Sequence, residues 1–479
     1  MPRNSPIRRT KIVATLGPSW EEPDQIRALL DAGVNVVRIN SSHGTPEIRS
    51  RWISSLKTVI GQCSSACAIL VDLQGPRIRV GGLPEPLALA AKEVVTFAPE
   101  ELAGEGEIPT TYEGLAGDVH PGSRILLDDG LLTVDVTEVR GDRVRGTVRY
   151  AGILKANKGM NLPGIEVSAP AITDKDRDDA LLAAELGVDF IGMSFVRRPE
   201  DLEAMRRLLP KSIKLIAKIE KDTALRHLDG IIESSDAIMV ARGDLGVELP
   251  FEQVPLVQKR LIREANRHGK PVITATQMLE SMIVAPRPTR AEVSDVANAI
   301  LDGTDAVMLS AETAVGKYPL EAVRAMDRIA REVESHRREG SDEPAWESSA
   351  VHLRQPHVTA RTEDAISVAV CAAAELLKVP LIVCLTSSGF TARTVASYRP
   401  TVPILAVTPE EETFRQLALV WGVIPARIDH YPDYDKTFPV AQGIVRKMEL
   451  AAPGERVVVT AGVPFDVAGT TNFLKIESA

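Results

Sequence analysis

Short runs of Val, Ile and Leu alternate with longer amphipathic segments in two stretches of the chain, residues 1–80 and 167–335. This alternation predicts repeated units of one β-strand followed by one α-helix. We expect eight strands, at residues 12–16, 34–39, 68–73, 188–194, 213–219, 237–241, 272–276 and 306–309. Among the helices, residues 251–268 place Val254, Val257, Leu261 and Ala265 on one face. Eight such units over roughly 250 residues predict a (β/α)8 TIM barrel of the α/β class.

Residues 81–166 interrupt this pattern between the third strand and the third helix. Val134 and Val136 alternate with polar residues, a period of two that is typical of strands. We therefore expect a small β-barrel-like domain inserted at this point. Gly81-Gly82 and Pro163-Gly164 flank the insertion, and we expect it to act as a lid over one end of the barrel.

The chain beyond the barrel changes in character again. Residues 336–355 are polar and charged, and we expect them to form a linker. Further on, strands expected at residues 380–385, 402–407 and 456–461 alternate with helical segments. Residues 356–479 are therefore predicted to form a separate C-terminal α/β domain.

Composition excludes several classes of protein. The chain carries 56 Lys and Arg against 65 Asp and Glu, so it lacks the basic excess of a nucleic-acid binder. Four cysteines in 479 residues do not form a disulfide framework. No apolar run approaches the ~18 residues that span a bilayer, and no apolar segment follows the N-terminal arginines. We expect a soluble cytoplasmic protein without membrane or nucleic-acid partners, with Arg8-Arg9 in a solvated terminus.

Polar residues stand at the C-terminal ends of seven of the eight expected strands. Catalytic groups of (β/α)8 barrels gather at this end, and residues two apart on a strand point to the same side. The residues are Arg38 and Asn40, Asp72, Ser194, Lys218 and Glu220, Arg242 and Asp244, Thr276, and Ser310 with Glu312. One such pair is explained by a structural salt bridge. Seven strand ends together predict an active site.

The residue types at this rim indicate the chemistry. Glu220 and Asp244 are hard oxygen ligands without a nearby His or thiolate, which favours Mg²⁺ or Mn²⁺ over Zn²⁺. Arg38, Arg79 and Lys218 supply cations around that metal. Phosphoryl transfer needs this combination, because its catalysis is positioning plus charge neutralisation. No Walker-type loop or Gly-rich dinucleotide fingerprint follows a strand, which argues against P-loop and Rossmann chemistry.

Several long segments of the chain resemble pyruvate kinases. They are TKIVATLGPS at 10–19, VRINSSHG at 37–44, IAKIE at 216–220, MVARGDLGVELP at 239–250, PVITATQMLES at 271–281, PRPTRAEVSDVANAILDG at 286–303 and VMLSAETAVG at 307–316. The resemblance runs from about residue 9 to the last residues. It implies a phosphotransferase that converts phosphoenolpyruvate and ADP to pyruvate and ATP in the last step of glycolysis. It also implies dependence on Mg²⁺ or Mn²⁺ and a homotetramer.

The resemblance also implies roles for individual residues. Lys218 is similar to the lysine that neutralises the transferred phosphoryl group and the enolate, and Glu220 and Asp244 to the metal ligands. Phosphate contacts are implied for Arg38 and Arg79, contacts to the three-carbon acid for Gly243, Asp244 and Thr276, and a proton route for Thr276 and Ser310. The nucleotide side is implied to comprise Asn40, Ser42, His43 and Arg79, with Lys158 from the lid segment KANKGMNLPG at 155–164.

The segment after the third strand departs from the potassium-dependent members of the family. Those members carry a Thr-Lys pair after the strand-three Asp and a Glu shortly beyond. Here the sequence is DLQGPRIRV at 72–80, so Leu73 removes a hydroxyl and Arg77 supplies a permanent cation. We therefore predict that K⁺ is not required and that Arg77 substitutes for it. The alternative interpretation makes Arg77 a surface salt-bridge residue.

The C-terminal domain contains a second candidate site. Hydroxyls, a glycine and free N–H groups at a helix start favour anion binding. The residues are Thr386, Ser387, Ser388, Gly389 and Thr391, and they resemble the effector loop of the family, with residues 462–472 as the facing loop. Because the late loop holds no arginine for a second phosphate, a sugar monophosphate or AMP is as well supported as a bisphosphate. The alternative is a helix cap without a ligand.

Two other functions are alternatives to this interpretation as a phosphotransferase. One is a related barrel enzyme that handles phosphoenolpyruvate or an enolate without a nucleotide, against which Lys158 and the Asn40, Ser42 and His43 segment count. The other is a catalytically silent regulatory protein on the same fold. Intact Lys218 and Glu220, with the other rim residues, argue against it.

Overall fold

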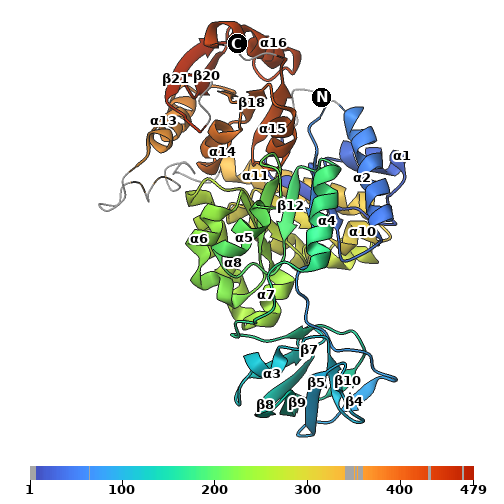
Figure 1. Cartoon of the computed structure of the whole chain (residues 1–479). Coiled ribbons are helices and arrows are strands. Elements are labelled where there is room, and N and C mark those ends of the chain that lie inside the picture. The colour runs from blue at the N-terminus through green and yellow to red at the C-terminus, as the bar shows by residue number, and fades with distance from the viewer. Residues whose placement is uncertain are drawn as a thin grey trace.

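The computed structural model describes residues 7–63, 65–339, 350, 353, 360–429, 433–465 and 469–479. Its centre is a closed barrel of eight parallel strands in the order β1-β16-β15-β14-β13-β12-β3-β2 (Figure 1). The strands are β1 Lys11–Thr15, β2 Val36–Asn40, β3 Ala68–Asp72, β12 Phe190–Met193, β13 Lys214–Ile219, β14 Ala237–Ala241, β15 Val272–Ala275 and β16 Ala306–Leu309. Each expected strand overlaps one of these, so the predicted (β/α)8 barrel is confirmed.

Helices surround the barrel in the expected alternation. They are α1 Pro23–Asp31, α2 Pro46–Gly61, α4 Asp174–Glu185, α5 Pro199–Arg206, α6 Leu228–Ser234, α8 Val254–Arg267, α9 Arg290–Leu301 and α11 Pro319–Glu339, with short α7 Arg242–Glu248 and α10 Ala311–Ala314 after β14 and β16. Helix α8 starts three residues later than expected, after the 3-10 turn Phe251–Gln253. Its buried face includes Gln258, which donates to Asp302, whereas Val254 is only partly buried.

The insertion between β3 and α4 forms its own β-domain with a separate hydrophobic core that includes Phe97, Ile125 and Val134. A six-stranded sheet has the order β11-β7-β8-β9-β5-β6, and β10 pairs with β4 in a second sheet. The elements are β4 Leu87–Leu89, β5 Val94–Pro99, β6 Ile108–Thr110, α3 Leu115–Asp118, β7 Arg124–Leu127, β8 Leu132–Arg140, β9 Arg143–Tyr150, β10 Gly152–Leu154 and β11 Met160–Asn161. The alternation at Val134 and Val136 falls within β8, as the period of two predicts.

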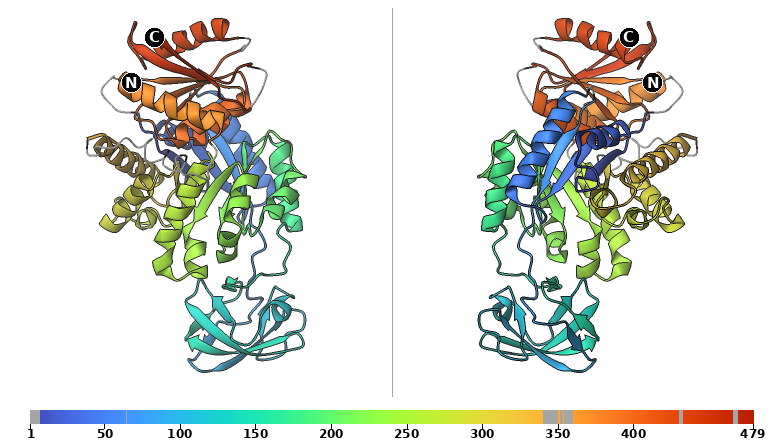
Figure 2. Two further views of the ribbon diagram at one scale, coloured as in Figure 1. Left: turned by 90° about the vertical axis from the view of Figure 1, so that its left-hand side faces the viewer. Right: turned by 90° about the vertical axis from the view of Figure 1, so that its right-hand side faces the viewer.

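The C-terminal region is a five-stranded sheet of order β19-β18-β17-β20-β21, with β21 antiparallel. Its elements are α13 Thr362–Leu376, β17 Ile382–Leu385, α14 Phe390–Ser397, β18 Ile404–Thr408, α15 Glu411–Gln416, the 3-10 turn Leu417–Leu419, β19 Val423–Arg427, α16 Tyr434–Lys447, β20 Arg456–Ala461 and β21 Phe473–Ser478. The inserted β-domain, which is expected to act as a lid and is called the lid below, lies at the opposite end of the barrel from this domain (Figures 1 and 2). Most of the expected linker lies outside the described residues, although α11 extends to Glu339.

Contacts with the C-terminal domain close the N-terminal end of the barrel. Leu419 is 1% exposed and packs in one cluster with barrel residues that include Val13, Leu70 and Met239. Beside it, the Arg399 Nη2 atom lies 2.9 Å from Asp305 Oδ2. A side chain of another domain therefore completes the core of the barrel at its N-terminal end.

The expectation that Arg8-Arg9 is a solvated terminus is wrong. Arg8 Nε donates to Asp327 Oδ1 at 2.9 Å, and the backbone N–H of Arg9 donates to Glu334 Oε2 at 2.8 Å. Both carboxylates come from α11, and they provide counter-charges that the local sequence around Arg8 does not reveal. Within the described parts of the chain, no helix is both long and apolar enough to cross a membrane.

Candidate active site

Four buried charged side chains form one cluster at the C-terminal ends of β2, β3 and β13. Lys218 Nζ lies 3.0 Å from Asp72 Oδ1 and 2.8 Å from Glu220 Oε1. Arg38 Nε donates to Asp72 Oδ2 at 2.7 Å, on the other side of the same carboxylate. Lys218 also donates to Ser194 Oγ at 2.6 Å. The parallel barrel thus brings together strand ends that are far apart in sequence.

Within this cluster, Asp72 and Lys218 hold each other ionised. Burial raises the pKa of Asp72, but the Lys218 and Arg38 cations together lower it by more than burial raises it. The pKa of Asp72 therefore lies below its ordinary value. Burial lowers the pKa of Lys218, but Asp72 and Glu220 raise it more, so it lies above its ordinary value. Lys218 is therefore a fixed buried cation at neutral pH, which suits a role in binding negative charge.

Glu220 and Asp244 have the chemistry of a divalent-metal pair. Burial raises the pKa of Glu220, Lys218 lowers it, and the neighbouring Asp244 carboxylate raises it again, leaving the pKa above its ordinary value. Repulsion between two hard carboxylates is relieved by a cation such as Mg²⁺. Within the described ranges, no group of three or more acidic, His or Cys side chains is arranged to hold a metal ion. A cation at this pair would therefore take its other ligands from water and substrate.

Thr276 has a strained backbone beside Gly243. Its φ of +66° is uncommon for any non-glycine residue and unfavourable for a β-branched one. Its Oγ1 atom donates to Ala275 O at 2.6 Å and accepts from the Gly243 N–H at 2.8 Å. A Cβ added at Gly243 would lie 3.3 Å from Thr276 Oγ1, so glycine permits this close approach.

Ser310 follows β16 and has an available hydroxyl. Its backbone N–H donates to Glu312 Oε2 at 2.7 Å. Its Oγ atom is buried and has no hydrogen-bond partner among the described residues. Such a group is satisfied by an ordered water or by a substrate atom.

The barrel and the C-terminal region each match a family model. Residues 7–323 match the barrel domain of pyruvate kinase, and residues 364–477 match its alpha/beta domain. The chain belongs to the pyruvate kinase family. It is a phosphotransferase, as the curated relatives of this family are.

Relatives match pyruvate kinase sequence and structure over almost the whole chain. The chain is 46% identical over 480 residues to pyruvate kinase of Geobacillus stearothermophilus, covering 98% of this chain and 80% of that protein. It is 41% identical over 478 residues to that of Clostridium acetobutylicum, covering 98% and 99%. The crystal structure of a pyruvate kinase from Cryptosporidium parvum superposes with a TM-score of 0.92 at 35% identity, covering 98% of this chain and 96% of that one.

The rim of this pyruvate kinase family member includes one residue that the sequence analysis did not predict. Thr15 ends β1 and accepts a hydrogen bond from Arg38 Nη1 at 3.0 Å. With Thr15, all eight strand ends carry a polar group. The expected strand ran to Leu16 and so hid the polar end, which a boundary one residue earlier reveals.

The residues predicted for the nucleotide lie in two groups. On the lid side, Arg79 Nη1 donates to Asn157 O at 2.8 Å and Lys158 Nζ lies 2.8 Å from Asp128 Oδ1. At the end of β2, the Ser42 N–H donates to Asn40 Oδ1 at 3.0 Å, and His43 is exposed. In the described structure no hydrogen bond joins the two groups.

Arg77 is exposed, and no ion pair joins it to a residue within the described ranges. Its charge adds to burial in lowering the pKa of Arg79. The surface salt-bridge interpretation therefore has no partner in this structure. The cation-substitute interpretation remains a prediction.

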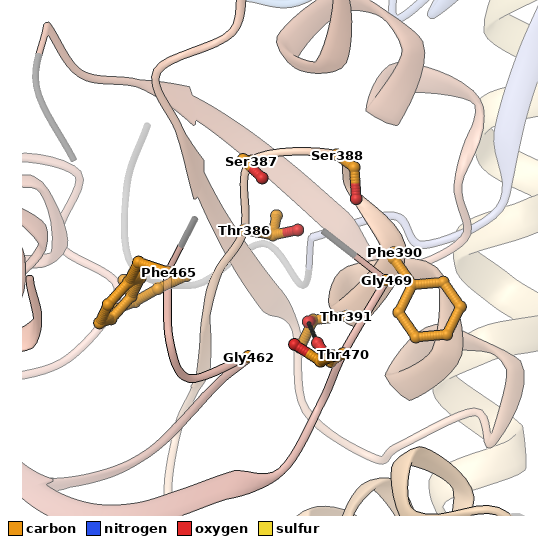
Figure 3. A pocket seen from close by; sticks show the side chains of 10 residues that line it. Thr386, Ser387, Ser388, Phe390, Thr391, Gly462, Phe465, Gly469 and Thr470 are labelled. Carbon is orange, nitrogen blue, oxygen red and sulfur yellow. Dashed lines mark hydrogen bonds between the residues drawn. The ribbon is translucent and has the colours of Figure 1, made fainter. Parts of the chain in front are cut away.

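The loop after β17 borders a pocket in the C-terminal domain (Figure 3). Four of the five predicted effector residues line it, and Gly389, with a φ of +75°, turns the chain into α14. Figure 3 shows the hydroxyl groups between the rings of Phe465 and Phe390. Arg393, one turn into α14, donates to Ser388 O at 3.0 Å.

Proposed function

We propose that this protein transfers the phosphoryl group of phosphoenolpyruvate to ADP and releases pyruvate and ATP. The observation that carries the proposal is the Lys218 ammonium, which is buried between two carboxylates and next to Arg38. A fixed cation in a water-poor site stabilises developing negative charge at little reorganisation cost. Family membership supports the same reaction.

In this mechanism Arg38 and Lys218 bind the phosphoryl oxygens of phosphoenolpyruvate. The bond between phosphorus and the enol oxygen breaks, and a bond to an oxygen of the ADP β-phosphate forms in line with it. Lys218 neutralises charge on the phosphoryl group during transfer and on the enolate oxygen afterwards. The backbone of Gly243 and the hydroxyl of Thr276 bind the substrate carboxylate, and Asp72 orients Arg38 and Lys218.

Glu220 and Asp244 would hold Mg²⁺ or Mn²⁺, which when bound supplies neutralisation of phosphate charge and orientation of the oxygens. Members of the family generally need Mg²⁺. The enolate then takes a proton at its terminal carbon. The unpartnered Ser310 hydroxyl and Thr276 Oγ1 support a proton route through ordered water. Asn40, Ser42, His43, Arg79 and Lys158 would bind the nucleotide as the lid closes.

A lactate-dehydrogenase-coupled assay tests the reaction directly. Lys218→Met is expected to lower kcat by roughly a thousandfold, the scale of removing a main charge-stabilising group. Lys214→Met is the control, because Lys214 lies at the other end of the same strand. Pyruvate formation that does not need ADP would favour the nucleotide-free barrel enzyme. No turnover in the folded wild type would favour the silent regulatory protein.

We further propose that the enzyme works without K⁺, although members of the family usually need it. Arg77 and Leu73 support this proposal, because a guanidinium supplies in-built positive charge. Activity in tetramethylammonium salts should change less than about twofold on addition of K⁺, whereas Arg77→Glu should introduce activation by K⁺. Strong activation of the wild type by K⁺ would refute the idea.

The pocket at Thr386, Ser387, Ser388 and Thr391 supports regulation by a phosphorylated metabolite, a sugar monophosphate or AMP. Titration of each candidate at low phosphoenolpyruvate tests this, and unchanged saturation with all of them would refute it. We also propose a homotetramer, to be measured by light scattering. The domain limits proposed above, 1–80 with 167–335, 81–166 and 356–479, are testable by limited proteolysis.

A further inference from the structure

One carboxylate oxygen of Glu248 contacts both the lid and a residue next to the active-site rim. Glu248 Oε1 accepts a hydrogen bond from Asn161 Nδ2 at 2.9 Å and from Lys221 Nζ at 2.6 Å. Asn161 belongs to the lid strand β11, Lys221 follows β13, and Glu248 ends α7. Three elements from two domains therefore meet at one atom.

The position of this contact in the chain links it to both proposed metal carboxylates. Lys221 directly follows Glu220, and Glu248 lies one helical turn after Asp244 on α7. Figure 1 shows α7 at the end of the barrel that faces the lid. A displacement of Asn161 relative to α7 would therefore change the contact at Glu248, one helical turn from Asp244.

The Lys221–Glu248 pair is too deeply buried to be a surface ion pair. The two side chains are 8% and 1% exposed. The second carboxylate oxygen, Glu248 Oε2, is buried without a hydrogen-bond partner in the described structure. A buried ion pair adds little net stability compared with apolar side chains, because desolvation offsets the attraction. A contribution to the stability of the fold therefore does not by itself explain why the Lys221–Glu248 pair is present.

The lid side of the contact is connected to the proposed nucleotide residue Lys158. Strand β11 pairs with β7 through Asn161↔Leu126 and Met160↔Leu127. The residue after Leu127 is Asp128, which holds Lys158 at 2.8 Å. Fixing Asn161 on Glu248 thus fixes the sheet edge that carries Lys158.

We propose that Asn161, Lys221 and Glu248 form a latch that sets the lid relative to Glu220 and Asp244. They are positioning residues: the latch holds the phosphate-binding side of the lid over the metal carboxylates without touching the reacting atoms. This inference rests on the proposed function. If wild-type protein forms no pyruvate from phosphoenolpyruvate in the presence of ADP, the proposed function fails, whereas the latch is tested separately by direct binding of nucleotide and Mn²⁺.

The test uses Asn161→Asp, which is isosteric and places a carboxylate against Glu248. Repulsion between the like charges disfavours the latched lid. We expect the KM for ADP, and the Kd for Mg-ADP by calorimetry, to rise about tenfold or more while the KM for phosphoenolpyruvate changes less than about twofold. Mn²⁺ affinity in the absence of nucleotide, measured by electron paramagnetic resonance, should change by less than about twofold, since both metal carboxylates stay in place.

The rescue variant is the double substitution Asn161→Asp with Glu248→Gln. It exchanges the donor and acceptor between positions 161 and 248, and it leaves the net charge of the three residues unchanged. We expect it to recover most of the lost ADP affinity. Glu166→Gln serves as control, because its ion pair with Arg226 is exposed and spans 3.9 Å. Equal changes in the KM values for ADP and phosphoenolpyruvate, or failure of the rescue in a protein of wild-type Tm, would overturn the latch.

Discussion

Arg399 links the C-terminal domain to the barrel through several buried hydrogen bonds, and the effect of removing it on stability can be calculated. Nη1 and Nη2 donate to the two oxygens of Asp305 at 3.0 and 2.9 Å. Nη2 also donates to Gly303 O at 2.6 Å, and the guanidinium lies 5.0 Å from the centre of the Trp421 ring. The side chains of Arg399 and Asp305 are only 3% and 4% exposed. Arg399→Met keeps much of the apolar volume and removes the charge.

The loss of stability in Arg399→Met depends mainly on Asp305, the buried carboxylate that remains without its partner. Breaking a buried pair from one side costs about 3–5 kcal/mol. Asp305 keeps the N–H donors of Val272 and Trp421 at 3.0 and 3.1 Å, which favours the lower end of that range. Unfolding entropy of roughly 2.1 cal/mol/K per residue over 479 residues is about 1 kcal/mol/K. The Tm should therefore fall by about 3–5 °C if the chain unfolds as one unit, and further if the C-terminal domain separates first.

Differential scanning calorimetry measures this shift and shows whether a second transition appears. Adding Asp305→Asn to Arg399→Met removes the orphaned charge and should recover part of the loss. Arg361→Met is the control, because Arg361 is 52% exposed and its pair with Asp364 should contribute less than about 1 kcal/mol. A shift for Arg399→Met no larger than that of the control would refute the reasoning.

Three further substitutions test other parts of the fold. Leu419→Ala empties the N-terminal end of the barrel and should cost about 2–5 kcal/mol by calorimetry, with an unchanged KM for phosphoenolpyruvate. Burial lowers the pKa of Lys11 to about 7, so between pH 7 and about 10.4 the unfolded state binds more protons and stability rises with pH. Lys11→Met should therefore raise Tm most below pH 7, and an advantage that does not shrink toward pH 10 would contradict this. Gly75 has a φ of +71°, and a Cβ added there would lie 2.9 Å from Ser194 Cβ. Gly75→Ala should therefore displace Ser194, which accepts a hydrogen bond from Lys218, and should lower kcat strongly while Tm falls only slightly.

The sequence by itself determined the barrel and most of its rim. Buried parallel strands have nearly continuous apolar runs, so eight strands were recognisable one by one. Closure of the barrel then dictates that their C-terminal ends meet, which places Lys218, Glu220 and Asp72 together without knowledge of any contact. The family motifs added the expected reaction, because long motifs contain many of the site residues together.

Only the tertiary structure decided which groups pair between distant segments of the chain and between domains. Arg8 was expected in solvent because no nearby residue indicates its partner, Asp327, which is more than three hundred positions away. The same holds for Leu419 inside the barrel and for Asn161 on Glu248. Local patterns of polar and apolar residues report burial and secondary structure, because these depend on neighbours within a few positions. Partner choice between domains depends on how finished surfaces pack, and no short stretch of sequence carries that information.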